Sequence, residues 1–300
     1  MPRCDGARYI SSMANDPSTV SPDTPARLAE SGRLADVVAP DSPARAELAD
    51  AARRYARPLQ VRVTGRAGSG RATVARALHE RLSVAATSDT GGDDADLWMH
   101  VLTGPPRAHD RDMLARSPTD RTIVVLNKSD THRDPVVAAE VAARCAEQID
   151  QAVIPVSALL ARATVTDDEF GFLRELARTG EEMPAMAGAF LSAGPDDERV
   201  VRAALMRRLD RTGIEIALEL LAAHPDVTDT TMLDRELWRR SGIDEVIAPI
   251  TERVGRVRQW RLVELRTRLE TIAARGHDRD AVEPLLAQLA ETEATRWPAA

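Results

Sequence analysis

Three glycines in one short loop offer the chemistry of phosphate binding. Residues 65–73 read GRAGSGRAT and follow an apolar run at residues 59–64. A loop of the form G-x-x-x-x-G-K-[ST] points its backbone N–H groups inward around a phosphate at a helix N-terminus. Gly65 and Gly70 have the glycine spacing of that pattern. The residues expected to surround a phosphate are Gly65, Gly68, Ser69, Gly70, Arg71, Ala72 and Thr73.

Three positions of this loop weaken the pattern. Arg71 stands where lysine is expected, and a planar guanidinium does not simply replace a compact ammonium group curled over the loop. Ala72 replaces the serine or threonine whose hydroxyl would bind Mg²⁺. Thr73 has a hydroxyl, but one step along a helix turns it by about 100°. The loop alone therefore fits either a phosphate site or a glycine turn that packs a strand against a helix.

A second group of residues suits the recognition of guanine. Asn127, Lys128 and Asp130 lie in the segment NKSD at the end of an apolar run. An aspartate there can accept hydrogen bonds from N1 and N2 of guanine, whereas adenine lacks this pair of donors. The asparagine would connect the base loop to the phosphate loop, and the lysine stem would pack over the base. A polar turn after a strand is the alternative, but Lys128 is the only lysine among 40 basic residues.

A third element follows further along the chain. Ser157 and Ala158 stand 27 and 28 residues after Asp130, beyond an expected helix and strand. A backbone N–H group there could donate to O6 of guanine. The tripeptide at residues 157–159 is a weak signal alone and gains weight from its position after NKSD.

In this order the three elements resemble a P-loop GTPase from about residue 59 to 160. The resemblance implies GTP or GDP as the cofactor, with the loop at residues 65–73 on the phosphates. It implies that Asn127, Lys128 and Asp130 recognise the base and that Ser157 and Ala158 make the last base contact. The segment SGIDEVIAPITERV and the long helix after it resemble the C-terminal part of actinobacterial dynamin-like proteins.

The region between the phosphate loop and the base motif is short for this superfamily. Only 17 residues separate Arg71 from Asp89, where Asp89-Thr90-Gly91-Gly92 fits the Asp-x-x-Gly pattern of a γ-phosphate switch. An acidic turn is the alternative reading of these four residues. With Ala72 and the shortened switches, the usual means of holding Mg²⁺ and orienting an attacking water are missing. Slow hydrolysis or none is therefore expected, and the sequence leaves a role for Mg²⁺ open.

Alternating patterns predict an α/β fold with a doubly wound, mostly parallel sheet, a shortened version of the P-loop NTPase arrangement. We expect strands at 59–64, 97–103, 121–130 and 152–159, because each contains a short apolar run. Helices are expected at 42–57, with Ser42 as its N-cap, at about 71–82, around 110–116 and at 134–149. The segment 83–96 is expected to be a polar connection.

After residue 165 the pattern predicts an α-helical bundle or hairpin domain. Its helices are expected at about 197–222, 229–240, 243–274 and 278–295, with Ser241 and Asp244 forming a capping box. Residues 1–27 are rich in Ser, Pro, Asp and Thr and are expected to be a disordered tail. The expected domains are thus the tail at 1–27, a GTPase-like domain at 28–165 and a helical domain at 166–300.

Composition excludes several classes of protein. A net charge of −7 with interspersed signs argues against a nucleic-acid binder. Two cysteines are too few for a disulfide framework, and no segment has the roughly 18 apolar residues of a membrane span or the core of a secretory signal. A cytoplasmic location is therefore expected. His100, His109 and His132 lack a second ligand at a fixed spacing, so no metal site is expected.

Two hypotheses from different classes remain open. In the first, the protein binds guanine nucleotide and acts as a regulatory or assembly factor. In the second, it is a pseudo-GTPase scaffold whose C-terminal helices pair with an active dynamin-like GTPase, with another copy of the chain, or with a membrane surface. An ATP-using kinase is disfavoured because NKSD would then be accidental.

Overall fold

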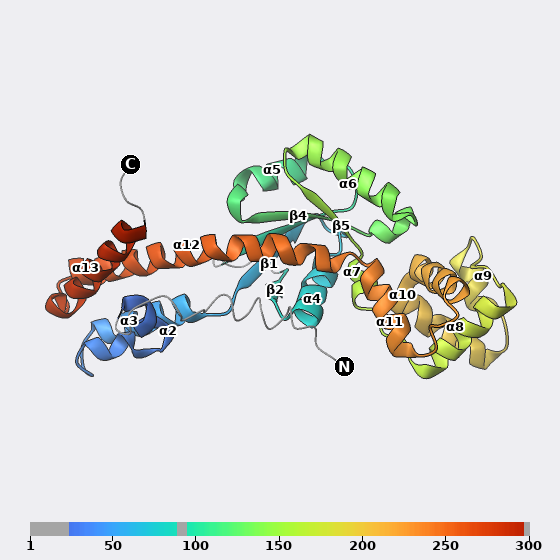
Figure 1. The fold of residues 1–300 in the computed structure, drawn as a ribbon, viewed down its shortest axis with the longest axis horizontal. Helices are drawn as coiled ribbons and strands as arrows, with labels where there is room; N and C mark the ends of the chain where they lie inside the picture. The colour runs from blue at the N-terminus through green and yellow to red at the C-terminus, as the bar shows by residue number, and fades with distance from the viewer. Residues whose placement is uncertain (1–23, 89–94, 297–300) are drawn as a thin grey trace. The chain divides into compact units, whose positions relative to one another are not determined.

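The computed structural model describes residues 24–88 and 95–296 (Figure 1). The described chain divides into two compact units, one formed by residues 24–59 together with residues 251–296, and one within Gln60–Ile250. The expected domain boundary at 165 thus lies inside the second unit. The segment Asp89–Gly92, with its Asp-x-x-Gly pattern, lies outside the described residues.

The second unit contains a five-stranded sheet in which every pairing is parallel. Its strands are β1 (Gln60–Gly65), β2 (Ala85–Thr87), β3 (Leu97–Leu102), β4 (Thr122–Asn127) and β5 (Val153–Val156), in the order β2-β1-β3-β4-β5. All six residues of β4 are buried, as expected of a strand covered on both faces. Pro155 lies in β5, an edge strand, where a missing N–H donor is tolerated. The predicted parallel α/β fold is confirmed.

One strand was not predicted. Residues 85–87, expected to lie within a polar connection, form β2 and pair with residues 60–62 of β1. The run Ala-Ala-Thr has only one β-branched residue, so its local strand signal is weak. Pairing with β1 supplies the hydrogen bonds that its own sequence does not predict.

Helices cover both faces of the sheet. They are α4 (Arg71–Leu82), α5 (Ala108–Arg116) and α6 (Pro135–Ile149). Figure 1 shows α5 and α6 on one side of the strands and α4 on the other. This follows from the strand order, because right-handed crossovers that run in opposite directions from β1 place their helices on opposite faces. The Asp134 side chain caps α6 by accepting a hydrogen bond from the Val136 N–H group.

The remainder of the second unit is helical, as predicted for the residues after 165. The strand expected at 152–159 ends at Val156, because a helix begins at Ala158. It comprises α7 (Ala158–Ala161), α8 (Asp167–Thr179), α9 (Ala187–Ser192), α10 (Asp196–Ala223), α11 (Thr230–Arg240) and the 3₁₀ turn η4 (Ile243–Val246). Their apolar faces enclose a core that includes Phe170, Leu173 and Phe190. The predicted capping box is not formed: Gly242 is the N-cap of η4, and the Ser241 hydroxyl instead accepts a hydrogen bond from the Ile243 N–H group.

The other unit is a set of packed helices. It contains α2 (Pro25–Glu30), the 3₁₀ turn η1 (Arg33–Val37), α3 (Ala44–Ala56), α12 (Ile247–Ala274) from Thr251 onward, and α13 (Arg279–Arg296). Leu34 and Leu48 share a buried core with Leu265, Leu269 and Val282. The helix after Ser42 was expected to belong with the sheet, but its apolar face packs in this core. Helix α2 also begins within the expected tail, whose residues 1–23 lie outside the described part.

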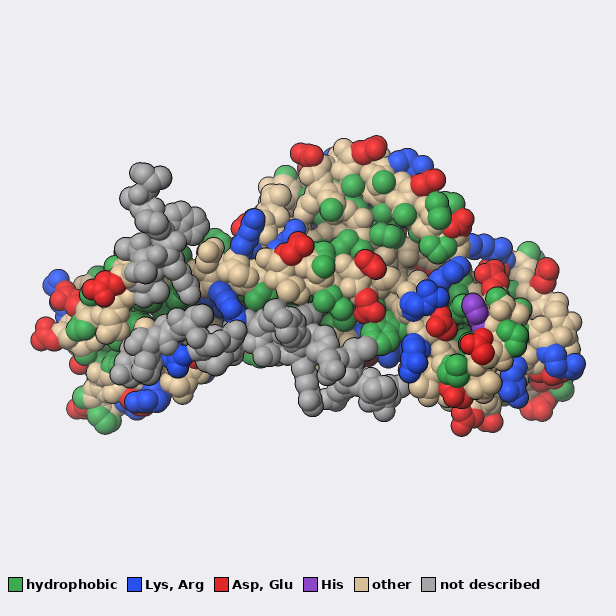
Figure 2. All heavy atoms as spheres, in the orientation of Figure 1, with side chains coloured by type: hydrophobic (Ala, Val, Ile, Leu, Met, Phe, Trp, Pro, Cys, Tyr) green, Lys and Arg blue, Asp and Glu red, His purple; other side chains and the backbone are tan. Residues whose placement is uncertain are grey.

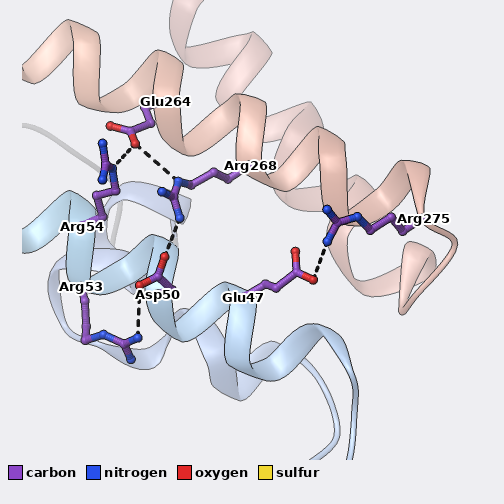
Figure 3. A network of polar contacts seen from close by, with 7 residues as sticks. All are labelled: Glu47, Asp50, Arg53, Arg54, Glu264, Arg268 and Arg275. Atoms are coloured by element: carbon purple, nitrogen blue, oxygen red, sulfur yellow. Dashed lines mark hydrogen bonds and ion pairs between the residues drawn. The ribbon is translucent and has the colours of Figure 1, made fainter. Parts of the chain in front are cut away.

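Polar contacts join α3 to α12 on the surface of this unit (Figure 3). Asp50 pairs with Arg268 at 2.6 Å, and Glu47 pairs with Arg275 at 2.6 Å. Arg54 pairs with Glu264, which also contacts Arg268. The hydrogen bond from Arg268 lowers the pKa of Asp50 below its usual range.

Charged side chains of both signs alternate over α8–α11 on the face shown in Figure 2, and no single-sign patch covers it. In the described part of the chain, none of the helices combines the length and apolar character needed to cross a bilayer.

Candidate functional site

The glycine loop lies at the one point of the sheet where the chain reverses its direction of strand addition. β2 lies on one side of β1 and β3 on the other. Ligands of open α/β sheets bind at such a reversal, beyond the carboxyl ends of the strands. The loop follows the carboxyl end of β1 and leads directly into α4.

Two of the glycines are required by close backbone approaches. Gly65 has φ +137° and Gly70 has φ +90°, both in the region that favours glycine. A Cβ atom at Gly65 would lie 2.6 Å from the Val101 carbonyl oxygen, and one at Gly70 would lie 2.4 Å from Asn127 Nδ2. Gly68 also has a positive φ, +80°, but a Cβ atom there would meet open space.

The N-terminus of α4 has the features of an anion site. Its N-cap is Gly70, and no side chain caps it. The first N–H groups of a helix lack partners within the helix and carry partial positive charge. Arg71 is half-buried and Ala72 is exposed. Among the described residues, Arg71 has no carboxylate partner, and the buried Ser69 hydroxyl has no hydrogen-bond partner.

Asn127 brings the three predicted elements together. Its side-chain Nδ2 donates to the Ser69 carbonyl oxygen over 2.9 Å, and its Oδ1 accepts from the Ala158 N–H group over 3.0 Å. The residue is 5% exposed, so these bonds are made away from water. The end of β4, the glycine loop and the start of α7 are thereby joined through one amide.

The two residues after it are placed differently. Lys128 has φ +64° and an exposed side chain, without an ion-pair partner in the described part of the chain. Asp130 is half-buried in the 3₁₀ turn η3 (Ser129–His132). A cavity of about 270 Å³ lies beside it, lined by Ser129, Asp130, Arg133, Pro155, Leu160, Arg240 and neighbouring residues.

Ser157, expected with Ala158 to make the last base contact, is the N-cap of α7, and Ala158 is the first residue of that helix. The Ser157 N–H group donates to the Ser241 carbonyl oxygen over 2.7 Å, and the Ala158 N–H group donates to Asn127. The N–H groups of Ser157 and Ala158 therefore both have partners within the chain. Gly242 reinforces this attachment, since a Cβ atom there would lie 2.7 Å from the Pro155 carbonyl oxygen.

Sequence reasoning missed a buried polar network next to the loop. Thr64 Oγ1 lies 3.1 Å from His100 Nδ1, and His100 Nε2 lies 3.3 Å from Asp110 Oδ1. Asp110 Oδ2 accepts from the Arg107 N–H group over 3.0 Å and lies 3.3 Å from Arg66 Nε. Burial lowers the pKa of His100, although its hydrogen bond with Asp110 opposes this shift. The only sequence signal was a polar histidine within an apolar strand.

In the described ranges 24–88 and 95–296, no group of three or more His, Cys, Asp or Glu side chains is placed to hold a metal ion. The sequence matches no protein-family model, and comparison with curated proteins yields no match.

Proposed function

We propose that this protein binds guanine nucleotide in the loop at residues 65–73 and hydrolyses it slowly or not at all, acting as a regulatory or assembly factor. The observation that carries the proposal is the pair of hydrogen bonds made by Asn127. They hold the segment with the only lysine of the chain against a glycine loop that precedes an uncapped helix N-terminus.

The residues of the loop fit a phosphate better than they fit Mg²⁺. Gly65 and Gly70 allow the loop to lie close against Val101 and Asn127 at positive φ, and backbone N–H groups follow at the start of α4. Ala72 offers no hydroxyl to a metal ion. We therefore assign Arg71 to the phosphates, Lys128 and Asp130 to the base, and no residue to Mg²⁺.

Calorimetry of the full chain with GDP, GTP and ATP, each with and without Mg²⁺, tests the proposal. We expect binding of GDP and GTP in preference to ATP, with little dependence on Mg²⁺. Asp130→Asn should move the preference toward xanthine nucleotides, because an amide N–H group replaces a carboxylate acceptor. Asp112→Asn, on the exposed side of α5, is the charge-matched control. Equal binding of ATP and GTP would contradict base recognition by Asp130.

Hydrolysis can be tested separately. Arg71→Lys combined with Ala72→Ser restores the pattern of the loop but not the shortened switches. Fast GTP turnover by this double variant would contradict the proposed loss of hydrolysis.

A scaffold without nucleotide is the second candidate. The observation that favours it is the bond from Ser157 to Ser241, which attaches the expected base contact to the α11–η4 turn. In this candidate the sheet serves to hold helices that bind a protein partner, another copy of the chain or a membrane surface. Absence of any heat with all three nucleotides would favour it.

A further inference from the structure

Asp110 is a buried carboxylate in α5, outside the residues assigned to nucleotide. Its side chain is 1% exposed. Transfer of an ionised carboxylate out of water is costly unless charge and hydrogen bonds compensate it. Asp110 has three partners, contributed by β3, by the loop before α5 and by the glycine loop: His100, the Arg107 N–H group and Arg66.

His100 does not supply the compensating charge. Its ring is 1% exposed, and burial lowers its pKa, which favours the neutral imidazole. A neutral ring that donates from Nε2 to Asp110 leaves Nδ1 to accept from the Thr64 hydroxyl, and both short contacts are then satisfied. Arg66 is therefore the cation that balances Asp110.

Arg66 lies inside the glycine loop, immediately after Gly65. Its contact with Asp110 uses Nε, and 28% of the side chain remains exposed. A guanidinium has five N–H donors in a rigid fork, so the Nη1 and Nη2 groups remain for another acceptor. No second carboxylate pairs with Arg66 among the residues that the structure describes.

We propose that Arg66 is a second phosphate-binding cation of the loop and that Asp110 and His100 are its positioning residues. This inference rests on the proposed function and names the part of the nucleotide concerned, the polyphosphate. The buried carboxylate holds one edge of the guanidinium, so that the other edge faces the bound phosphates. Together Arg66 and Arg71 supply two positive charges where the usual loop has a lysine and a metal ion.

The experiment compares guanosine with GDP by calorimetry of the full chain without Mg²⁺. Arg66→Gln should weaken GDP binding by about tenfold, a typical loss for a charge-assisted hydrogen bond, and leave guanosine binding unchanged. Arg76→Gln, an exposed change on α4 with the same loss of charge, is the control. If Arg66 had only a structural role, Arg66→Gln would change the affinities for guanosine and GDP together, or would change neither affinity.

Positioning by Asp110 is tested in two backgrounds. Asp110→Asn should weaken GDP binding several-fold in the wild-type chain and have no further effect in the Arg66→Gln chain, because the residue acts through Arg66. Equal losses in both backgrounds would overturn the positioning role.

A second variant, Arg66→Lys, tests the same geometry if the Asp110→Asn protein does not fold. A lysine keeps the charge beside Asp110, but one ammonium group cannot face both the carboxylate and a phosphate as the two edges of the fork do. We expect near-wild-type thermal stability and GDP binding as weak as in Arg66→Gln. Wild-type GDP affinity in Arg66→Lys would overturn the bridging geometry.

The outcomes separate this inference from the proposed function. If Arg66→Gln binds GDP like Arg76→Gln while wild-type protein binds guanosine, the Arg66 inference falls and guanine recognition stands. If wild-type protein binds pyrophosphate in an Arg66-dependent manner but not guanosine, base recognition falls and the phosphate site stands. If wild-type protein binds none of these ligands, both fall.

Discussion

Two of the arginine–carboxylate networks in the described part of the chain differ in burial. At the carboxyl edge of the sheet, Asp110 is 1% exposed and pairs with Arg66. On the surface of α3 and α12, Asp50 is 53% exposed and pairs with Arg268 (Figure 3). Exposed pairs contribute little because water solvates both partners well, whereas a buried carboxylate without its partners is strongly destabilising. The buried pair of Asp110 and Arg66 is therefore expected to fix the position of the glycine loop. The exposed pair of Asp50 and Arg268 is expected to add little to the packing of α3 on α12.

The largest loss of stability is expected from a substitution in the glycine loop, whose Arg66 belongs to the buried network. Gly65→Ala would bring a Cβ atom to 2.6 Å from the Val101 carbonyl oxygen at φ +137°. We expect a loss of about 4 kcal/mol, from strain and overpacking together. Gly68→Ala is the matched control, with open space and a cost of about 1 to 2 kcal/mol. Denaturant unfolding measures both, and equal losses would show that the close approach to Val101 is unimportant.

The next largest effect should follow from removing the Asn127 amide. Asn127→Ala leaves the Ser69 carbonyl and the Ala158 N–H group without this partner in a buried place. We expect a loss of about 2 to 3 kcal/mol, and faster hydrogen exchange at the start of α7. Thr131→Ala, an exposed change in the same turn, should cost less than about 0.5 kcal/mol. A similar small loss for Asn127→Ala would mean that the three elements hold together without it.

A pH series probes the buried network directly. The pKa of His100 is lowered by burial, so the neutral ring stabilises the fold above the ordinary histidine pKa of about 6.5. That contribution is lost as pH falls through the lowered pKa. Asp110 opposes the shift and His109 adds to it. Thermal unfolding should show a steeper loss of stability as pH falls below about 6.5 in the wild type than in His100→Gln. Parallel curves would contradict a neutral, buried His100.

The smallest loss of stability is expected from a substitution in the exposed network of α3 and α12. Arg268→Gln removes the contacts with Asp50 and Glu264 and should cost less than about 1 kcal/mol. The difference should nearly vanish at an ionic strength of about 1 M, where screening is strong. Arg256→Gln, at an exposed position of the same helix, is the control. A loss that persists at high salt would place this network in the same class as the buried one.

Local features of the sequence predicted most of the elements. The helices expected at 197–222 and 229–240 correspond to α10 and α11, because their apolar spacing and flanking turns are properties of a single segment. β4 was equally clear, as a continuous apolar run before NKSD. β2 was missed because its hydrogen bonds, rather than its residue types, make it a strand.

The candidate site was predictable only in part. The glycine spacing and the lone lysine pointed to the loop and to NKSD, and the contact of Asn127 with the glycine loop was expected. One backbone N–H group within residues 157–159 was expected to contact guanine, and the N–H groups of Ser157 and Ala158 bond to Ser241 and Asn127. Their partners lie 84 and 31 residues away in the sequence, where no local pattern connects them.

The sequence by itself determined the class of the fold, the glycine loop and the helical character of the region after residue 165. These depend on residue types and short spacings that act within one element. Only the tertiary structure decided that Thr64 lies opposite His100, that Asp110 faces Arg66, and that the helix at 44–56 packs with α12 and α13. The reason is that strand register and helix packing join segments distant in the sequence, and their free energy comes from burial that no single segment encodes.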